Sequence, residues 1–208
     1  MMISVVRHGR TAANAARLLQ GRIDNPLDDF GRDQAARVAA ALGRAEVPVD
    51  RIVSSPLSRA RSTAEPLAAA LAARRVVEID DRWIELDYGD WEGRAIADVS
   101  ASEWEHWRAD VGFAPPGGES LAEVNERVRD ACADIAADPR GEHVAVFTHM
   151  SPVKAAVGWT VDWPADQTAA PLDLSWRLHV APAQITTIGF NGDTPILLAF
   201  NDTAHLRA

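Results

Sequence analysis

Three short segments of the chain carry the side chains best suited to phosphate chemistry. Arg7 and His8 follow one apolar run, and Arg59 comes shortly after a second. His149 stands at the end of a third. Guanidinium groups hold phosphate oxygens through paired hydrogen bonds, and a neutral imidazole nitrogen can attack phosphorus. If they meet in one pocket, these side chains predict the binding and transfer of a phosphoryl group.

The elements that must position these residues alternate between branched apolar runs and alanine-rich helical stretches. This alternation is typical of βαβ units, so we predict an α/β fold with helices on both faces of a mostly parallel central sheet. The predicted strands are Ile3–Val6, Arg51–Ser54, Val76–Ile79, His143–Thr148, Gln184–Phe190 and Ile196–Phe200. The predicted helices are Gly31–Arg44, Pro56–Ala73, Ser102–Ala109, Ser120–Ala137 and Pro152–Trp159. Ser120 with Glu123 predicts a capping box at the start of the fourth of these helices.

Each of the three segments leaves the end of a strand and enters a helix. Thr11 is suited to cap the first of these helices. Ser55 before Pro56, and Ser151 before Pro152, predict a capping serine followed by proline at the helix start. In an open parallel sheet, ligands bind beyond the carboxyl ends of the strands, where helix amino termini present N–H groups. We therefore expect one anion-binding site at this edge.

Composition limits the class of partner and the location. The formal net charge of −9 over 208 residues disfavours a nucleic-acid partner. Cys132 is the only cysteine, and neither a signal peptide nor a membrane-spanning apolar run is recognisable, so we expect a cytoplasmic protein without a membrane partner. The length fits one domain covering residues 1–208. Loops are expected at Gly112–Gly118 and Pro164–Pro171.

Residues 93–118 interrupt the alternation of strands and helices. We predict that this segment is a small insertion over one end of the sheet and over the active site. Its aromatic residues Trp104, Trp107 and Phe113 leave two interpretations open. They either belong to a lid or cover part of the core.

The first segment, Val5 to Asn14, resembles the Arg-His-Gly-x-Thr-x-x-Asn signature of the histidine phosphatases and the cofactor-dependent phosphoglycerate mutases. Further blocks follow in the order of that family at Gln20-Gly21, Leu27–Gly31 with Gln34-Ala35, Ser54–Ala60, Glu85–Gly93, Gly117–Ser120 and Thr148-His149. Ordered blocks at sensible spacings rarely arise by chance. The resemblance covers nearly the whole chain and implies the phosphoglycerate mutase-like fold.

The resemblance implies that His8 is the nucleophile, forming a phosphohistidine without a metal or a cofactor. It also implies that Arg7, Arg59 and His149 form the catalytic phosphate pocket. These roles agree with the chemistry of the groups, because a backbone carbonyl on one imidazole nitrogen would fix the tautomer and leave the other nitrogen to attack. The arginines would then stabilise the oxygens of the transition state.

Glu85 resembles the general acid of the family, which protonates the leaving oxygen and afterwards activates water. A carboxyl group in that role must hold a proton, so we expect its pKa to be raised by burial beside Tyr88 or Trp91.

Four further residues are expected to contact substrate or phosphate, namely Asn14, Gln20, Gly21 and Met150. Met150 is a departure from the family, which usually has glycine there, and this block resembles an actinobacterial phosphatase branch. Arg10 also departs from the usual glutamate or glutamine. It either extends the positive field of the pocket or lies exposed at a helix start.

We predict hydrolysis of a small-molecule phosphomonoester. Mutases place basic residues just after the acid glutamate to hold a substrate carboxylate, whereas this chain has Leu86 and Asp87. The alternatives are a mutase-type phosphotransferase, a metallohydrolase that uses His8, His149 and Glu85 as ligands, and a non-catalytic module that binds a phospho-ligand. The substrate, the pH optimum and a homodimer formed through strand edges stay open.

Overall fold

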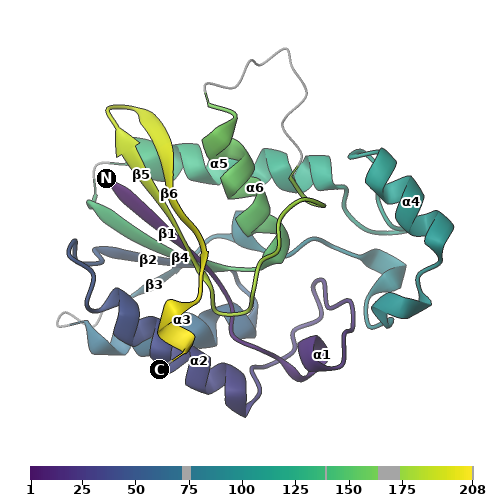
Figure 1. The fold of residues 1–208 in the computed structure, drawn as a ribbon, viewed down its shortest axis with the longest axis horizontal. Coiled ribbons are helices and arrows are strands. Elements are labelled where there is room, and N and C mark those ends of the chain that lie inside the picture. The colour runs from purple at the N-terminus through teal and green to yellow at the C-terminus, as the bar shows by residue number, and fades with distance from the viewer. Residues whose placement is uncertain (72–75, 139, 164–173, 208) are drawn as a thin grey trace.

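A six-stranded mixed sheet forms the centre of the computed structural model, which describes residues 1–71, 76–138, 140–163 and 174–207 (Figure 1). The strands are β1 (Met2–Arg7), β2 (Arg51–Ser54), β3 (Val77–Ile79), β4 (His143–Thr148), β5 (Ile185–Asn191) and β6 (Thr194–Asp202). Their order is β3-β2-β4-β1-β5-β6. The first four are parallel to one another, and β5 and β6 join as an antiparallel edge. The predicted mostly parallel sheet is confirmed.

Helices cover both faces of this sheet, which confirms the three-layer prediction. The helices are α1 (Ala12–Ala15), α2 (Asp29–Leu42), α3 (Ser58–Ala70), α4 (Ala101–Ala109), α5 (Leu121–Ala137) and α6 (Met150–Val161). In Figure 1, α2 and α3 lie below the sheet and α5 and α6 lie above it. Within the described residues, no helix has the length and apolar character needed to cross a lipid bilayer.

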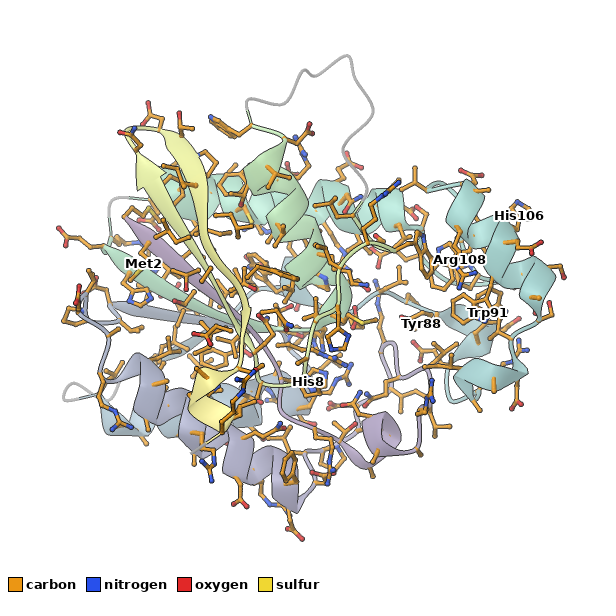
Figure 2. The ribbon with its side chains drawn as sticks, in the orientation of Figure 1. Met2, His8, Tyr88, Trp91, His106 and Arg108 are labelled. Carbon is orange, nitrogen blue, oxygen red and sulfur yellow. The ribbon has the colours of Figure 1, made fainter. Side chains whose placement is uncertain are left out.

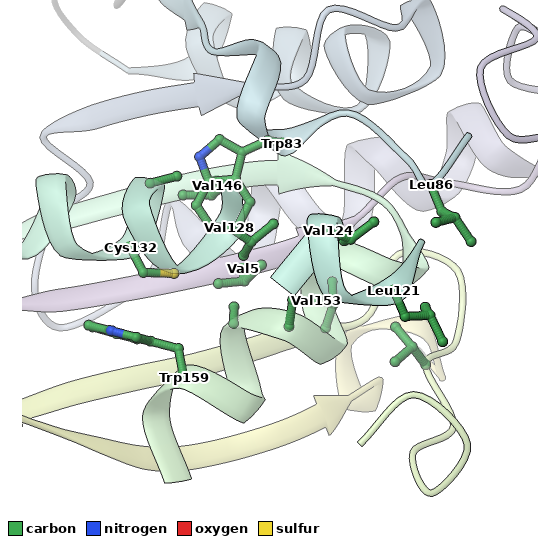
Figure 3. Packing of buried hydrophobic residues seen from close by; sticks show 14 of the residues in the cluster. Val5, Trp83, Leu86, Leu121, Val124, Val128, Cys132, Val146, Val153 and Trp159 are labelled. Carbon is green, nitrogen blue, oxygen red and sulfur yellow. The ribbon is translucent and has the colours of Figure 1, made fainter. Parts of the chain in front are cut away.

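Alternate residues of the central strands supply the two cores. In β4, Val144 and Val146 belong to the core between the sheet and helices α5 and α6, while Ala145 and Phe147 belong to the core between the sheet and helices α2 and α3. This follows from the two-residue period of a strand. Figure 3 shows the first of these cores, in which Cys132 packs among apolar side chains. Burial raises the pKa of the Cys132 thiol, as expected of a structural cysteine.

The register of the strands aligns the ends that carry the chemistry. Arg7 pairs with Thr148, and Ser54 pairs with Phe147. Beyond the last paired residues, the His8 N–H still donates to the carbonyl of Thr148 at 2.9 Å. The loops that follow β1, β2 and β4 therefore begin side by side at one edge of the sheet.

Local capping predictions hold at two helices. Thr11 accepts from the backbone of Asn14, whose side chain accepts from the backbone of Thr11, so the two residues form a capping box. Ser120 and Glu123 form the same motif at α5.

The predicted serine caps of α3 and α6 are wrong. Ser55 binds the ring of His149 at 2.7 Å, and the helix begins only at Ser58. Ser151 lies inside the first turn of α6, where its N–H donates to the carboxylate of Glu85 at 3.1 Å. At α6, Glu85 takes the N–H groups that the local pattern assigned to a serine, whereas the Ser55 hydroxyl also accepts from the Leu57 N–H at 3.3 Å but lies too far before α3 to cap it.

Residues 93–118 contain a short 3-10 helix, Ile96–Asp98, and α4, which projects beyond the sheet in Figure 1. The rings of Trp104 and Trp107 stack with centroids 5.5 Å apart, and Trp107 belongs to the core under α5 and α6. Trp104 and Phe113 pack against that core. The loop predicted at Pro164–Pro171 lies outside the described residues.

Candidate active site

A cavity of about 280 Å³ opens where the loops after β1 and β4 meet the chain between β3 and α4. Its lining comprises Arg7, His8, Asn14, Arg17, Leu18, Leu19, Gln20, Gly21, Arg59, Glu85, Tyr88, Ile96, Met150 and Pro182. Every predicted site residue except His149 lines this cavity. Figure 2 shows His8 below the end of the sheet, with Tyr88 on the side toward α4.

His8 is held in the state that a nucleophile needs. Its Nδ1 lies 2.7 Å from the carbonyl oxygen of Gly9, and because a carbonyl only accepts, Nδ1 carries the proton. The predicted carbonyl partner is thus confirmed, and Nε2 keeps its lone pair. Burial, aided by the charges of Arg59 and Arg7, places the pKa of His8 well below its usual 6.5. The imidazole is therefore neutral at pH 7.

The turn after His8 is fixed from two sides. The Gly9 N–H donates to Oγ1 of Thr63 at 3.0 Å, and that hydroxyl donates to the carbonyl of Arg59 at 2.7 Å. On the other side, the start of α2 packs directly on the turn. A Cβ at Gly9 would lie 2.4 Å from the carbonyl oxygen of Gly31, so only glycine allows this approach.

Arg59 is buried, with 0% of its surface exposed, and each of its nitrogens has a partner. Its Nε donates to Nδ1 of His149 at 3.2 Å. Its Nη1 and Nη2 donate to the carbonyls of Ile23 and Gly21 at 2.8 and 2.7 Å. A guanidinium has five N–H groups, so this anchoring fixes the side chain and still leaves protons for a ligand.

Arg7 approaches the cavity from the end of β1. Its Nη1 donates to the carbonyl of Val180 at 2.6 Å, while its buried Nε has no partner among the described residues. Burial lowers the pKa of Arg7, and the nearby charge of Glu85 opposes that shift. Arg7 therefore presents a charged group with unused N–H donors to the cavity.

His149 is completely buried and lies behind the cavity. Since its Nδ1 accepts from Arg59, its Nε2 carries the proton and donates to Oγ of Ser55 at 2.7 Å. Burial and the charge of Arg59 lower the pKa of His149 well below 6.5. The structure thus gives this imidazole a contact with Arg59, and its contact with phosphate stays a prediction.

Glu85 lies at the amino end of α6. One carboxylate oxygen accepts from the backbone N–H groups of Leu86 at 2.9 Å and Ser151 at 3.1 Å, and the other accepts from Met150 at 3.1 Å. The side chain is 6% exposed and lines the cavity. Three fixed donors therefore define the orientation of this carboxylate toward the cavity.

The remaining predicted contacts come from the segment after His8. Asn14 uses its Oδ1 to accept from Thr11, which leaves its Nδ2 without a partner among the described residues. Gln20 accepts from the hydroxyl of Thr11 at 2.8 Å. Gly21 adopts a φ of 51°, and a Cβ there would meet the carboxylate of Glu92 at 2.0 Å. Glycine is therefore favoured at this turn, whose carbonyl holds Arg59.

Sequence reasoning missed several residues of the site. Thr63 has a sequence signal, because it lies one helical turn after Arg59 on the same face of α3. Pro182 and Ile96 have no such signal, since they reach the cavity from segments without a recognisable motif.

The described residues contain no group of three or more His, Cys, Asp or Glu side chains arranged to hold a metal ion. His8, His149 and Glu85, the ligand set considered for a metallohydrolase, do not form such a group. Each of the three is instead hydrogen-bonded to protein groups.

Comparison with known proteins gives consistent matches. The family model "Histidine phosphatase superfamily (branch 1)" matches residues 3–203. A bifunctional protein of Mycobacterium tuberculosis is 34% identical over 192 residues, which cover 91% of this chain and 50% of that protein. The chain thus spans about half the length of the first curated relatives that it matches.

Two further matches cover more of the related protein. A probable phosphoglycerate mutase of Citrobacter koseri is 36% identical over 173 residues, which cover 79% of this chain and 77% of that protein. The structure of a mycobacterial glucosyl-3-phosphoglycerate phosphatase with VO3 superimposes with a TM-score of 0.83 at 29% identity. That match covers 97% of this chain and 99% of the other.

Thr63 is expected to position His8. Thr63→Val removes the acceptor of the Gly9 N–H and leaves that group buried and unpaired, a loss of about 1–3 kcal/mol. We expect kcat for phosphomonoester turnover to fall about tenfold or more with little change in KM, and Thr63→Ser to restore it. Steady-state kinetics beside thermal unfolding of both variants test this. Equal activity of the valine and serine variants would exclude the positioning role.

Stability is expected to fall as the pH drops below about 6.5. Because the folded-state pKa values of His8 and His149 are depressed, the unfolded chain takes up protons first, and the free energy of unfolding decreases with falling pH. Each imidazole contributes a slope of up to about 1.4 kcal/mol per pH unit. Urea unfolding between about pH 7.5 and 5.5 measures this slope. His8→Asn should reduce it, whereas the exposed His106→Asn should not; equal slopes would contradict the account.

Proposed function

Because the chain belongs to branch 1 of the histidine phosphatase superfamily, we propose that it is a phosphomonoester hydrolase that forms a phosphohistidine on His8. The observation that carries this proposal is the state of His8, a buried neutral imidazole with its Nε2 lone pair available beside two guanidinium groups. Such an imidazole attacks phosphorus without first losing a proton.

In the first half-reaction, Arg7, Arg59 and the Nδ2 amide of Asn14 bind the phosphoryl oxygens. Nε2 of His8 attacks phosphorus, so that an N–P bond forms while the P–O bond to the leaving group breaks. Glu85 donates its proton to the departing oxygen. The two guanidiniums stabilise the negative charge on the equatorial oxygens, and because backbone carbonyls already anchor them, little reorganisation accompanies the reaction.

In the second half-reaction, water attacks the phosphohistidine. The carboxylate of Glu85 takes a proton from that water, the N–P bond breaks, and inorganic phosphate leaves with His8 and Glu85 in their starting states. Glu85 is placed for both steps because it lines the cavity, and the three backbone donors that hold its oxygens favour the carboxylate form that acts as the base.

Residues after Glu85 favour hydrolysis over transfer to a second acid. Leu86 is buried, and Asp87 forms an ion pair with Arg22 at 3.2 Å. Neither is a basic residue that would hold a substrate carboxylate beside the general acid. The named phosphatase that superimposes on this chain agrees with hydrolysis. Phosphoryl transfer of the mutase type is the second candidate, since the Citrobacter koseri relative is named a probable phosphoglycerate mutase.

Release of phosphate is expected to depend on His8 and not on added metal. In buffer containing a chelator, His8→Ala should lose at least about a thousandfold in kcat, because no other group replaces the nucleophile. The assay follows free phosphate from a panel of phosphomonoesters, and mass spectrometry after rapid quenching detects phosphorylated His8. His106→Ala, an exposed histidine on α4, is the matched control.

The alternatives predict different results. Activity that a chelator abolishes and zinc restores would indicate the metallohydrolase. Isomerisation of 3-phosphoglycerate in excess of phosphate release would indicate the mutase, and binding of phosphomonoesters without turnover would indicate the binding module.

Glu85→Gln is expected to slow poor leaving groups more than good ones. Without a general acid, an alkyl phosphate should lose about 10²–10⁴-fold in kcat/KM, whereas p-nitrophenyl phosphate should lose much less because its leaving group needs no proton. Glu126→Gln, on the exposed face of α5, is the control. Because Glu85 caps α6, circular dichroism is used to verify that the Glu85→Gln variant keeps its helices folded. An equal loss of kcat/KM for both substrates would contradict the role of Glu85 as general acid.

A further inference from the structure

Arg17 is a cation at the cavity that the proposed chemistry does not use. It lines the same cavity as His8, and its side chain is exposed. Among the described residues, its guanidinium has neither a hydrogen bond nor an ion pair. An unpaired guanidinium next to a ligand site is available to the ligand.

The backbone at Arg17 adopts a conformation that glycine would occupy at lower cost. Its φ is 57°, in the left-handed region, which costs a residue with a Cβ of order 1 kcal/mol. Hydrogen bonds hold it there, because its N–H donates to Asn14 at 3.1 Å and its carbonyl accepts from Ile96 at 3.0 Å. A bridge between Leu18 and Ala95 continues this pairing. The guanidinium is thus carried on a fixed backbone rather than on a loose loop.

Other arginines near this end of the molecule have partners. Arg10 pairs with Asp28 at 2.7 Å, which places it at a helix start and not in the cavity lining. Arg22 pairs with Asp87 and Glu119, both at 3.2 Å. These pairs compensate the charges of Arg10 and Arg22, whereas the guanidinium of Arg17 has no such partner among the described residues.

The wall around Arg17 is largely apolar. Outside the phosphate pocket and Arg17, the lining consists mainly of Leu18, Leu19, Tyr88, Ile96, Met150 and Pro182. A group that extends from a bound phosphate therefore meets apolar surface and a single positive charge. Since the whole chain carries a net charge of −9, such a local cation is what would attract a second anionic group.

We propose that Arg17 determines specificity by binding a second anionic group on the substrate. The preferred substrates are phosphomonoesters whose leaving group has an apolar body and ends in a carboxylate or a second phosphate. This inference rests on the proposed phosphatase function of the same cavity. It differs from an anion contact beside the general acid, because Leu86 and Asp87 occupy that position and Arg17 comes from the segment after α1.

A pair of matched substrates tests the inference. 4-Carboxyphenyl phosphate and 4-carbamoylphenyl phosphate have the same ring and similar leaving groups, but only the first carries the extra charge. We expect the wild type to prefer the carboxylate about tenfold in kcat/KM, mainly through KM. Arg17→Ala should abolish this preference, Arg17→Lys should keep part of it, and Arg22→Ala should retain it. 1,4-Phenylene bisphosphate distinguishes a phosphate from a carboxylate as the preferred group.

Binding to His8→Ala separates this inference from the proposed function. Calorimetry with this variant, in which the nucleophile is absent, measures the affinity for both compounds without turnover. If the carboxylate compound binds more tightly and Arg17→Ala removes this difference in affinity, the inference is supported. This holds even if the wild type releases no phosphate, because the lack of phosphate release would overturn only the hydrolase proposal. Equal affinity and equal kcat/KM for the two compounds, or equal losses on both in Arg17→Ala, would overturn the role of Arg17.

Discussion

The carboxylate of Glu85 at the amino end of α6 is the interaction on which the site depends. Helix amino ends leave N–H groups unpaired, and most helices satisfy them with their own capping side chain. Here Glu85 accepts from the N–H groups of Met150 and Ser151, so a residue from the loop before α4 caps the amino end of α6. One contact thereby fixes the direction of the carboxylate, the first turn of α6 and the position of His149, which is the N-cap residue.

Burial and the charges around this carboxylate together set the protonation states of the other groups. Arg7 and Arg59 are buried cations, and the charge of Glu85 favours their protonated forms. Burial, aided by the charges of the same guanidiniums, lowers the pKa values of His8 and His149 and keeps both imidazoles neutral. A cavity with two fixed cations and neutral imidazoles is suited to a phosphate dianion, although the chain as a whole is acidic. The local field is therefore set by a few buried residues and not by composition.

Features that depend on neighbours in sequence were predictable, and features that depend on distant partners were not. The capping boxes at Thr11 and Ser120 involve residues three positions apart, and both predictions hold. The expected cap at Ser151 fails because Glu85, far away along the chain, binds the first N–H groups of α6, and the expected cap at Ser55 fails because α3 begins only at Ser58. The same reason hides the orientation of His149: its position at a strand end could be predicted, but its burial behind Arg59 follows from packing that no local pattern encodes.

The cavity divides into two parts with different structural origins. Arg7 and His8 stand at the end of β1, where the sheet register places them beside β4, and Arg59 stands on the buried face of α3. Arg17 and Ile96 instead lie on two loops that pair through the bridge between Leu18 and Ala95 and through backbone hydrogen bonds, one of which runs from the Ile96 N–H to the Arg17 carbonyl at 3.0 Å. Only part of these loops is tied to the phosphate pocket, because the carbonyls of Gly21 and Ile23 hold Arg59 while the guanidinium of Arg17 has no partner among the described residues. The shared family motif therefore does not by itself identify the phosphoester, because side chains from these loops form part of the wall that a leaving group would meet.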